Sequence, residues 1–136
     1  MNVAIVLISL ALHRPQPLVA RVYDAAPVDP VLACAVVETE SWFKPTAWHA
    51  NRDKAGKVWS TDYGLYQLCD AFHPQYRNDL YAHVRYGGAL VARLEIAAGG
   101  DRWKALAKYN TDPAYPSRVM RVFEEIRVCE ILGGQR

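Results

Sequence analysis

Apolar and polar positions follow a helical period over most of the chain. Residues 31–37 are apolar without interruption, which predicts a helix that is buried on all sides. Asp29 and Pro30 come directly before this run. An Asp that caps free N–H groups, followed by Pro at the first helical position, is a helix-start signal. We therefore expect a central buried helix from Pro30 to about Phe43.

Further helices are predicted on both sides of this central one. Between Pro, Gly and capping Asp residues, apolar positions recur three and four residues apart. The expected helices cover about residues 18–26, 80–98, 102–110 and 116–132. Gly87 and Gly88 lie inside the second of these helices. Because each glycine costs ~1 kcal/mol relative to alanine, we expect a neighbouring element to pack tightly there.

The helical period is absent from residues 44–62. This stretch contains the turn-forming sequence Asn-Arg-Asp-Lys-Ala-Gly at 51–56, flanked by two tryptophans. It predicts a small β-hairpin or an irregular lobe, and we expect one helical turn after it at 64–68. The fold class predicted from these patterns is mainly α (α+β), with a helical bundle around the central helix.

The first 17 residues leave two interpretations open. Residues 3–12 are almost all apolar, but a helix that spans a bilayer needs roughly twenty such residues. The segment is therefore either a secretion signal or a first helix or strand that packs on the core and ends at Pro15 and Pro17. Residues 18–136 are expected to form a single domain.

Composition and charge exclude several classes of protein. The chain has 136 residues, 51% of them apolar, which fits one globular domain with a sizeable core. The 16 basic and 14 acidic residues are interleaved and give a net charge of +2, unlike the basic face of a nucleic-acid binder. Three cysteines cannot all be paired, and the pair Cys69 and His73 has no visible companion ligands. We expect no metal site.

Two acids near the end of the central helix are candidates for chemistry. A carboxyl group in apolar surroundings has a raised pKa and holds a proton near neutral pH, as a general acid must. Glu38 and Glu40 lie two positions apart, about 200° around a helix, so only one of them faces a given cleft. Local physics does not choose between them, and a solvated helix end is the alternative for either.

The residues that follow resemble a known family. Residues 40–47, Glu-Ser-Trp-Phe-Lys-Pro-Thr-Ala, resemble the Glu-Ser-x-Phe-x-Pro-x-Ala segment that carries the catalytic acid of lytic transglycosylases in the lysozyme-like superfamily. Gly-Leu-Tyr-Gln-Leu at 64–68 is similar to the family's Gly-Leu-Met-Gln-Ile element. The run Ala-Leu-Ala-Lys-Tyr-Asn at 105–110 is similar to a closing helix with its Tyr-Asn pair. The order and spacing of these pieces carry the resemblance, from Leu18 to Pro113.

The resemblance implies a lysozyme-like fold and a set of site residues. Glu40 corresponds to the acid that protonates the bridging oxygen, and its carboxylate then acts as a base. Four further positions match residues that line the family's cleft: Ser41, Gln67, Tyr109 and Asn110. The alternative for these is buried polar groups that tie helices together. Trp48 and Trp59 flank the cleft side of the lobe. They either stack on sugar rings or belong to the core of the lobe.

A second resemblance overlaps the first. Ser-Thr-Asp-Tyr-Gly at 60–64 is similar to the segment of chicken-type lysozymes that supplies their second carboxylate, which makes Asp62 the partner of Glu40. A retaining glycosidase places two such carboxyl groups ~5 to 5.5 Å apart. The alternative is that Asp62 caps the following turn. The chain departs from the family at Thr111 and Asp112, where a small residue and Gly usually follow the Tyr-Asn pair, and at Tyr66, where Met is common.

The function implied is that of a peptidoglycan-degrading muramidase that cleaves the β-1,4 bond between N-acetylmuramic acid and N-acetylglucosamine. We expect a lytic transglycosylase, with a retaining lysozyme-type hydrolase that uses Glu40 and Asp62 as the alternative. A catalytically weak glycan-binding or structural component of a phage or secretion machine is the alternative from another class. We expect a monomer that needs no cofactor and binds peptidoglycan glycan strands at the bacterial cell wall. We expect it neither to bind nucleic acid nor to span a membrane. The sequence leaves the route of export open.

Overall fold

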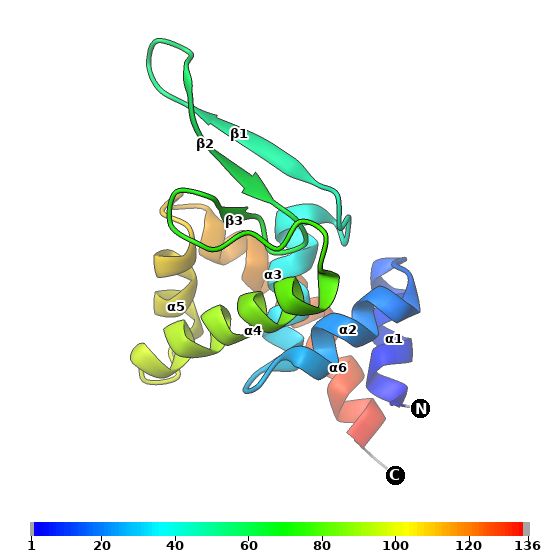
Figure 1. The fold of residues 1–136 in the computed structure, drawn as a ribbon. Coiled ribbons are helices and arrows are strands. Elements are labelled where there is room, and N and C mark those ends of the chain that lie inside the picture. Colours follow the sequence, from blue (N-terminus) through cyan, green and yellow to red (C-terminus); the bar gives the residue numbers. More distant parts are fainter. Residues whose placement is uncertain (1, 135–136) are drawn as a thin grey trace.

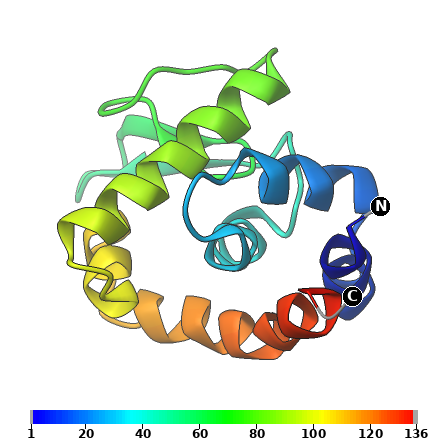
Figure 2. The ribbon, with the colours of Figure 1, turned by 90° about the horizontal axis from the view of Figure 1, so that it is seen from below.

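Helix α3 (Pro30–Ser41) is the centre of the fold. All residues from Val31 to Val37 are buried, as the uninterrupted apolar run predicts. Figure 2 shows α3 end-on, with the other helices arranged around it. An all-apolar helix is stable only when neighbours cover every side of it, so the ring of helices follows from the composition of α3.

The structure, a computed structural model, describes residues 2–134 (Figure 1). The helices around α3 are α1 (Val3–Leu12), α2 (Gln16–Ala25), α4 (Leu80–Ala97), α5 (Arg102–Tyr109) and α6 (Tyr115–Gly134). Strands β1 (Trp48–Arg52), β2 (Val58–Tyr63) and β3 (Leu68–Cys69) form one small sheet at one end of the helices. The predicted fold class, mainly α with a small β lobe, is confirmed.

The start of α3 is tied to two other helices through Asp29. One carboxylate oxygen of Asp29 accepts a hydrogen bond from the backbone N–H of Leu32 at 3.2 Å, which caps the helix as predicted. The other accepts from Nε of Arg102 on α5 at 2.8 Å. Nε of Arg102 also lies 3.8 Å from the buried carboxylate of Glu95 on α4. This charged cluster fixes α3 relative to α4 and α5.

The end of α3 is a sharp turn of the backbone. The helix stops at Ser41, two residues before the expected Phe43, because Trp42 and Phe43 both take left-handed conformations with φ of 53° and 57°. This conformation costs ~1–2 kcal/mol for a residue other than glycine. The turn buries Phe43 in the core and leaves Trp42 61% exposed. The burial of Phe43 offsets part of that cost.

The sheet is a hairpin extended by a very short third strand. β1 pairs with β2 in antiparallel register, with Ala50 opposite Thr61, and a bulge interrupts the ladder next to Asn51. β2 continues the sheet by pairing Tyr63 with Leu68 of β3. The helical turn expected at 64–68 is therefore wrong. Gly64 and Gln67 have positive φ values of 79° and 49°, which break a right-handed helix and return the chain to the sheet.

Helix α4 passes close to this returning segment. A Cβ atom added at Gly87 would overlap the ring of Tyr66, and one added at Gly88 would lie 3.1 Å from the carbonyl oxygen of Ala25. Tight packing against the two glycines is thus confirmed. Next to them, the backbone N–H of Tyr66 donates to Nε2 of the buried His83 at 3.0 Å. Burial lowers the pKa of His83 to about 4, so the ring is neutral and accepts this bond.

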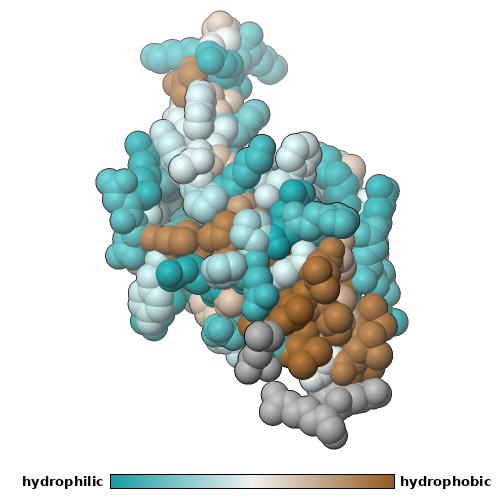
Figure 3. Space-filling model, turned by 90° about the vertical axis from the view of Figure 1, so that its right-hand side faces the viewer, coloured by the Kyte–Doolittle hydropathy of each residue, from teal (hydrophilic) through white to brown (hydrophobic). Residues whose placement is uncertain are grey.

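The apolar segment at the N-terminus forms α1, which packs against α6. Ile5 and Ile8 are buried, and a Cβ atom at Gly133 of α6 would overlap the backbone of Ala4. Figure 3 shows hydrophobic residues gathered beside the two chain ends, where α1 and α6 expose large apolar side chains, among them Val3, Leu10, Ile131 and Leu132. Within residues 2–134, no helix combines the length and hydropathy that a membrane span requires.

The contact between Gly87 and Tyr66 yields a test of the packing. We expect Gly87→Ala to lower the free energy of unfolding by about 2 kcal/mol, because the added methyl group overpacks the core. Gly88→Ala is the matched control, since its added contact at 3.1 Å is offset by a gain in helix propensity of ~1 kcal/mol. Urea unfolding followed by circular dichroism measures both. Equal stability of the two variants would contradict this packing.

Candidate active site

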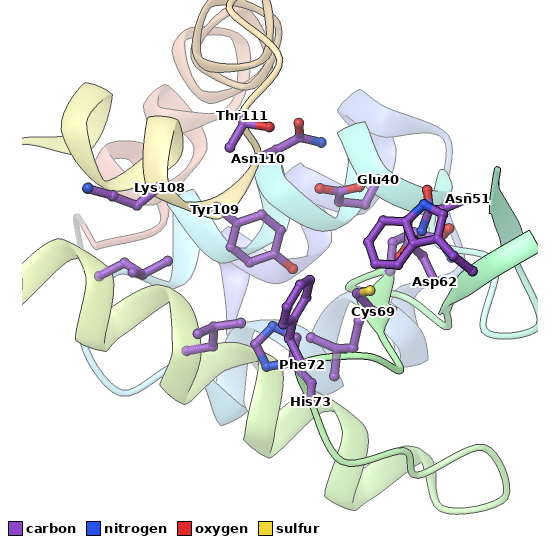
Figure 4. Close-up of a pocket in the computed structure, with 15 residues that line it drawn as sticks. Glu40, Asn51, Asp62, Cys69, Phe72, His73, Lys108, Tyr109, Asn110 and Thr111 are labelled. Atoms are coloured by element: carbon purple, nitrogen blue, oxygen red, sulfur yellow. Dashed lines mark hydrogen bonds between the residues drawn. The ribbon is translucent and has the colours of Figure 1, made fainter. Parts of the chain in front are cut away.

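A cleft of about 520 Å³ lies between the sheet, the last turn of α3 and the end of α5. Polar side chains reach it from all three segments. Figure 4 shows Glu40 of α3 between Asn51 and Asp62 of the sheet on one side and Asn110 and Thr111 after α5 on the other. The apolar part of the wall comes from Trp59, Leu68, Phe72, Leu90 and Leu94. Mixed polar and apolar walls of this kind suit a sugar ring, which has polar edges and apolar faces.

Glu40 is the group with perturbed acidity in this cleft. Its pKa is raised to about 7, chiefly by burial. The Tyr115 hydroxyl lowers this pKa, the negative charge of Asp62 raises it, and the positive charge of Arg118 lowers it. The Tyr115 hydroxyl is close enough to influence the carboxyl group, although it has no hydrogen-bond partner of standard geometry. At neutral pH the Glu40 carboxyl is therefore divided between its acid and its base form.

Glu38, the other acid at this end of α3, has a different environment. Its two carboxylate oxygens accept hydrogen bonds from Nε and Nη2 of Arg14 at 2.9 and 2.8 Å. This bidentate ion pair holds the stretch between α1 and α2 against α3. Glu38 and Glu40 thus face different surroundings, as two positions about 200° apart on a helix must.

Asp62 is held in the cleft by a residue that the sequence analysis assigned to a turn. Nδ2 of Asn51 donates to Oδ1 of Asp62 at 2.9 Å and to Oγ of Ser60 at 3.0 Å. Ser60 and Asp62 lie two residues apart on β2, so both point to the same face of the sheet. Asn51 sits opposite Ser60 across the hairpin and reaches both side chains. Only knowledge of the strand register could have identified Asn51.

Four of the remaining expected site residues line this cleft. Nε2 of Gln67 donates to the carbonyl oxygens of Ala47 at 3.0 Å and Gly64 at 2.9 Å. The Tyr109 hydroxyl donates to the carbonyl oxygen of Tyr66. Asn110 follows α5 directly, and Trp59 meets Phe72 edge-on with ring centroids 6.3 Å apart. The hydrogen bonds hold the side chains of Gln67 and Tyr109 in fixed orientations, whereas Trp59 is 55% exposed.

Two expected site residues lie elsewhere. Ser41 is buried, and its hydroxyl donates to the carbonyl oxygen of Val37 at 3.1 Å, inside α3. Trp48 is 66% exposed at the start of β1 and does not line the cleft. Conversely, several residues that the sequence analysis did not select do line it: Asn51, Cys69, Phe72, His73, Lys108 and Thr111. They come from segments far apart in the chain, so no local pattern connects them with Glu40.

Comparison with known proteins identifies a family. Residues 19–124 match the model of the family described as Transglycosylase SLT domain. This range covers more than half of the chain and contains Glu40, Asp62 and Asn110. No curated protein and no solved structure gave a significant match.

The environment of Glu40 predicts how stability changes with pH. Because folding raises this pKa from 4.5 to about 7, the folded state loses stability relative to the unfolded state as the pH rises from about 4.5 to about 7, and the loss is complete above that range. Glu40→Gln removes that loss. We expect the variant to gain about 2 kcal/mol over the wild type between pH 4 and pH 8.5, the partial exposure of the side chain limiting the effect.

Glu38→Gln is the control for this measurement. It breaks the ion pair with Arg14 and should lower the free energy of unfolding by about 2 kcal/mol at pH 8. Urea unfolding at several pH values measures both variants. If Glu40→Gln were destabilised at pH 8.5 as Glu38→Gln is, the Glu40 carboxyl would not be in a desolvated site.

Proposed function

The chain belongs to the transglycosylase SLT domain family, whose members cleave glycosidic bonds of peptidoglycan, and we propose that it cuts the β-1,4 bond between N-acetylmuramic acid and N-acetylglucosamine. The observation that carries this proposal is the Glu40 carboxyl, which lies in an open cleft with a pKa raised to about 7. A general acid works best when its pKa is near the pH at which it acts. The substrate places the activity at the bacterial cell wall.

In the proposed reaction, Glu40 acts first as an acid and then as a base. Protonated Glu40 gives its proton to the bridging oxygen, and the bond between that oxygen and C1 of the muramyl sugar breaks. Positive charge develops at C1, and the Asp62 carboxylate, held by Asn51, stabilises it electrostatically. The 6-hydroxyl of the same sugar then attacks C1 and passes its proton to the Glu40 carboxylate. The product is a 1,6-anhydro end, and Glu40 is again protonated.

A retaining hydrolase is the second candidate. Asp62 lines the same cleft as Glu40 and is held in place through Asn51, which favours a role beyond capping the next turn. In this route the Asp62 carboxylate bonds to C1 as the leaving group takes the proton from Glu40. Water, deprotonated by Glu40, then releases the sugar with a reducing end. Family membership favours the transglycosylase route.

The first prediction from the proposed function concerns the acid itself. Glu40→Gln keeps the shape of the side chain but has no proton to donate, so cleavage of purified peptidoglycan should fall by roughly 10³-fold. Release of soluble fragments measures the rate. Glu38→Gln breaks the ion pair with Arg14 and should lose much less activity than Glu40→Gln at temperatures where it is folded; the opposite order would make Glu38 the acid. Equal cleavage by Glu40→Gln and the wild type would contradict the role of Glu40, and no cleavage by the wild type would favour the glycan-binding alternative.

The second prediction separates the two reaction types. Asp62→Asn keeps the hydrogen-bonding shape but removes the negative charge, so a transglycosylase should lose about tenfold in rate through weaker stabilisation of C1. Its remaining products should still carry anhydro ends, as mass spectrometry would show. Reducing ends from the wild type, together with a loss in Asp62→Asn as severe as in Glu40→Gln, would establish the hydrolase instead.

The pH dependence of kcat/KM gives the third prediction. Glu40 must be protonated to start the reaction, so kcat/KM should fall as the pH rises through about 7. The charges near Glu40 predict shifts of opposite sign. Asp62→Asn removes a charge that raises this pKa, so the fall should move to lower pH, and Arg118→Gln should move it to higher pH. Shifts in the same direction would exclude Glu40 as the titrating group.

A further inference from the structure

A second hollow adjoins the cleft at Glu40. It has a volume of about 310 Å³, and Glu40 and Asn110 line both spaces. Its other walls come from the end of α3 and from the first turns of α6, with Trp42, Tyr115, Arg118 and Arg121 among the lining residues. Glu40 therefore stands between two binding spaces. A linear glycan with its scissile bond at Glu40 would occupy one space on each side of that bond.

The second hollow is richer in positive charge than the cleft. Arg118 and Arg121 line it, and Nζ of Lys44 lies over the ring of Trp42, 5.5 Å from the centroid. Glu38 also lines the hollow, but Arg14 neutralises its charge. Arg118 has one exposed ion pair, with Asp112 at 3.2 Å, and such pairs contribute little to stability. Within residues 2–134, Arg121 has no acidic side chain within ion-pair distance.

An exposed aromatic side chain also suits the hollow to a ligand. Trp42 exposes 61% of its surface beside the hollow, because the left-handed turn after α3 directs it outward. The indole of Trp42 lies beside Arg118 and Arg121 in the wall of the same hollow. A sugar ring would offer its apolar face to this indole, and a charged substituent of the sugar would meet the guanidinium groups.

A glycan cleaved at Glu40 extends through this second hollow, and we propose that Arg118 and Arg121 there select strands whose muramyl side chains carry carboxylates. This inference rests on the proposed function. The shared chemistry is a carboxylate next to an N-acetylated sugar. It has two sources in peptidoglycan: the lactyl group of a muramyl residue without peptide, and the acidic residues of an attached peptide. Guanidinium groups suit either, because they bind carboxylates through paired hydrogen bonds.

Binding to Glu40→Gln, which does not consume its ligand, tests the inference with three substrates. The first is soluble peptidoglycan strands with their peptides, the second is the same strands after amidase has removed the peptides, and the third is an N-acetylglucosamine oligomer of matched length. Calorimetry should show at least one carboxylate-bearing strand binding about tenfold more tightly than the uncharged oligomer. The carboxylate-bearing strand that binds tightly identifies the source of the recognised group.

Variants in the same Glu40→Gln background assign the effect to the hollow. Adding Arg121→Gln should weaken binding of the preferred strand about fivefold and leave the uncharged oligomer unchanged. Adding Trp42→Ala should weaken all substrates alike, because stacking does not depend on charge. Arg127→Gln is the matched control, since Arg127 lies on α6 in an ion pair with Glu124 and does not line the hollow. Thermal unfolding confirms that each variant is folded.

Three outcomes would overturn the inference: equal binding of charged and uncharged strands, an equal effect of Arg121→Gln on all substrates, or the same effect from Arg127→Gln. Cleavage by the wild type is measured in parallel on the peptide-bearing strands. If the wild type cleaves these strands but charged and uncharged strands bind equally well, only the role of the hollow is contradicted. If charged strands bind more tightly but the wild type does not cleave them, the proposed reaction is contradicted, and the hollow is supported as a binding site for carboxylate-bearing glycans.

Discussion

The site depends on one constraint: the carboxylic acid of Glu40 lies in the last turn of α3, a helix whose apolar residues are buried on all sides. Residues Val31 to Val37 of α3 contact only protein, so the helix axis is fixed by packing and cannot rotate to bring Glu40 into water. Burial then raises the pKa of Glu40 to about 7. The same apolar run that makes α3 the core of the fold thus also makes its last turn chemically unusual.

The sharp turn after α3 connects this constraint with the shape of the site. Trp42 and Phe43 take left-handed conformations, which are unfavourable for both residues. The turn returns Phe43 to the core and directs Trp42 outward. Trp42 thereby lines the second hollow on the α6 side of Glu40, while the cleft lies on the sheet side. A helix that continued to Phe43, as the pattern of the sequence predicts, would bring neither side chain to its observed position.

The sequence predicts the helices well because their signals are local. Caps, prolines and apolar spacing locate α3, α4 and α5 to within two residues, and Glu40 follows from the resemblance of residues 40–47. The features that could not be predicted from the sequence depend on contacts between distant segments. Strand β3 has two residues and exists only through pairing with β2. Asn51 reaches Asp62 only through the hairpin register, and Tyr115 and Arg118 approach Glu40 from α6.

The two sides of Glu40 carry opposite charges, and this asymmetry links acidity to the direction of the substrate. Asp62 on the sheet side raises the pKa of Glu40, whereas Arg118 on the α6 side lowers it. Negative charge on the sheet side suits the sugar that becomes positively charged at C1. Positive charge on the α6 side suits a leaving strand with carboxylates. In the proposed reaction, one arrangement of charges would therefore serve both to keep the proton at Glu40 and to orient the strand, with the sugar that becomes positively charged beside Asp62.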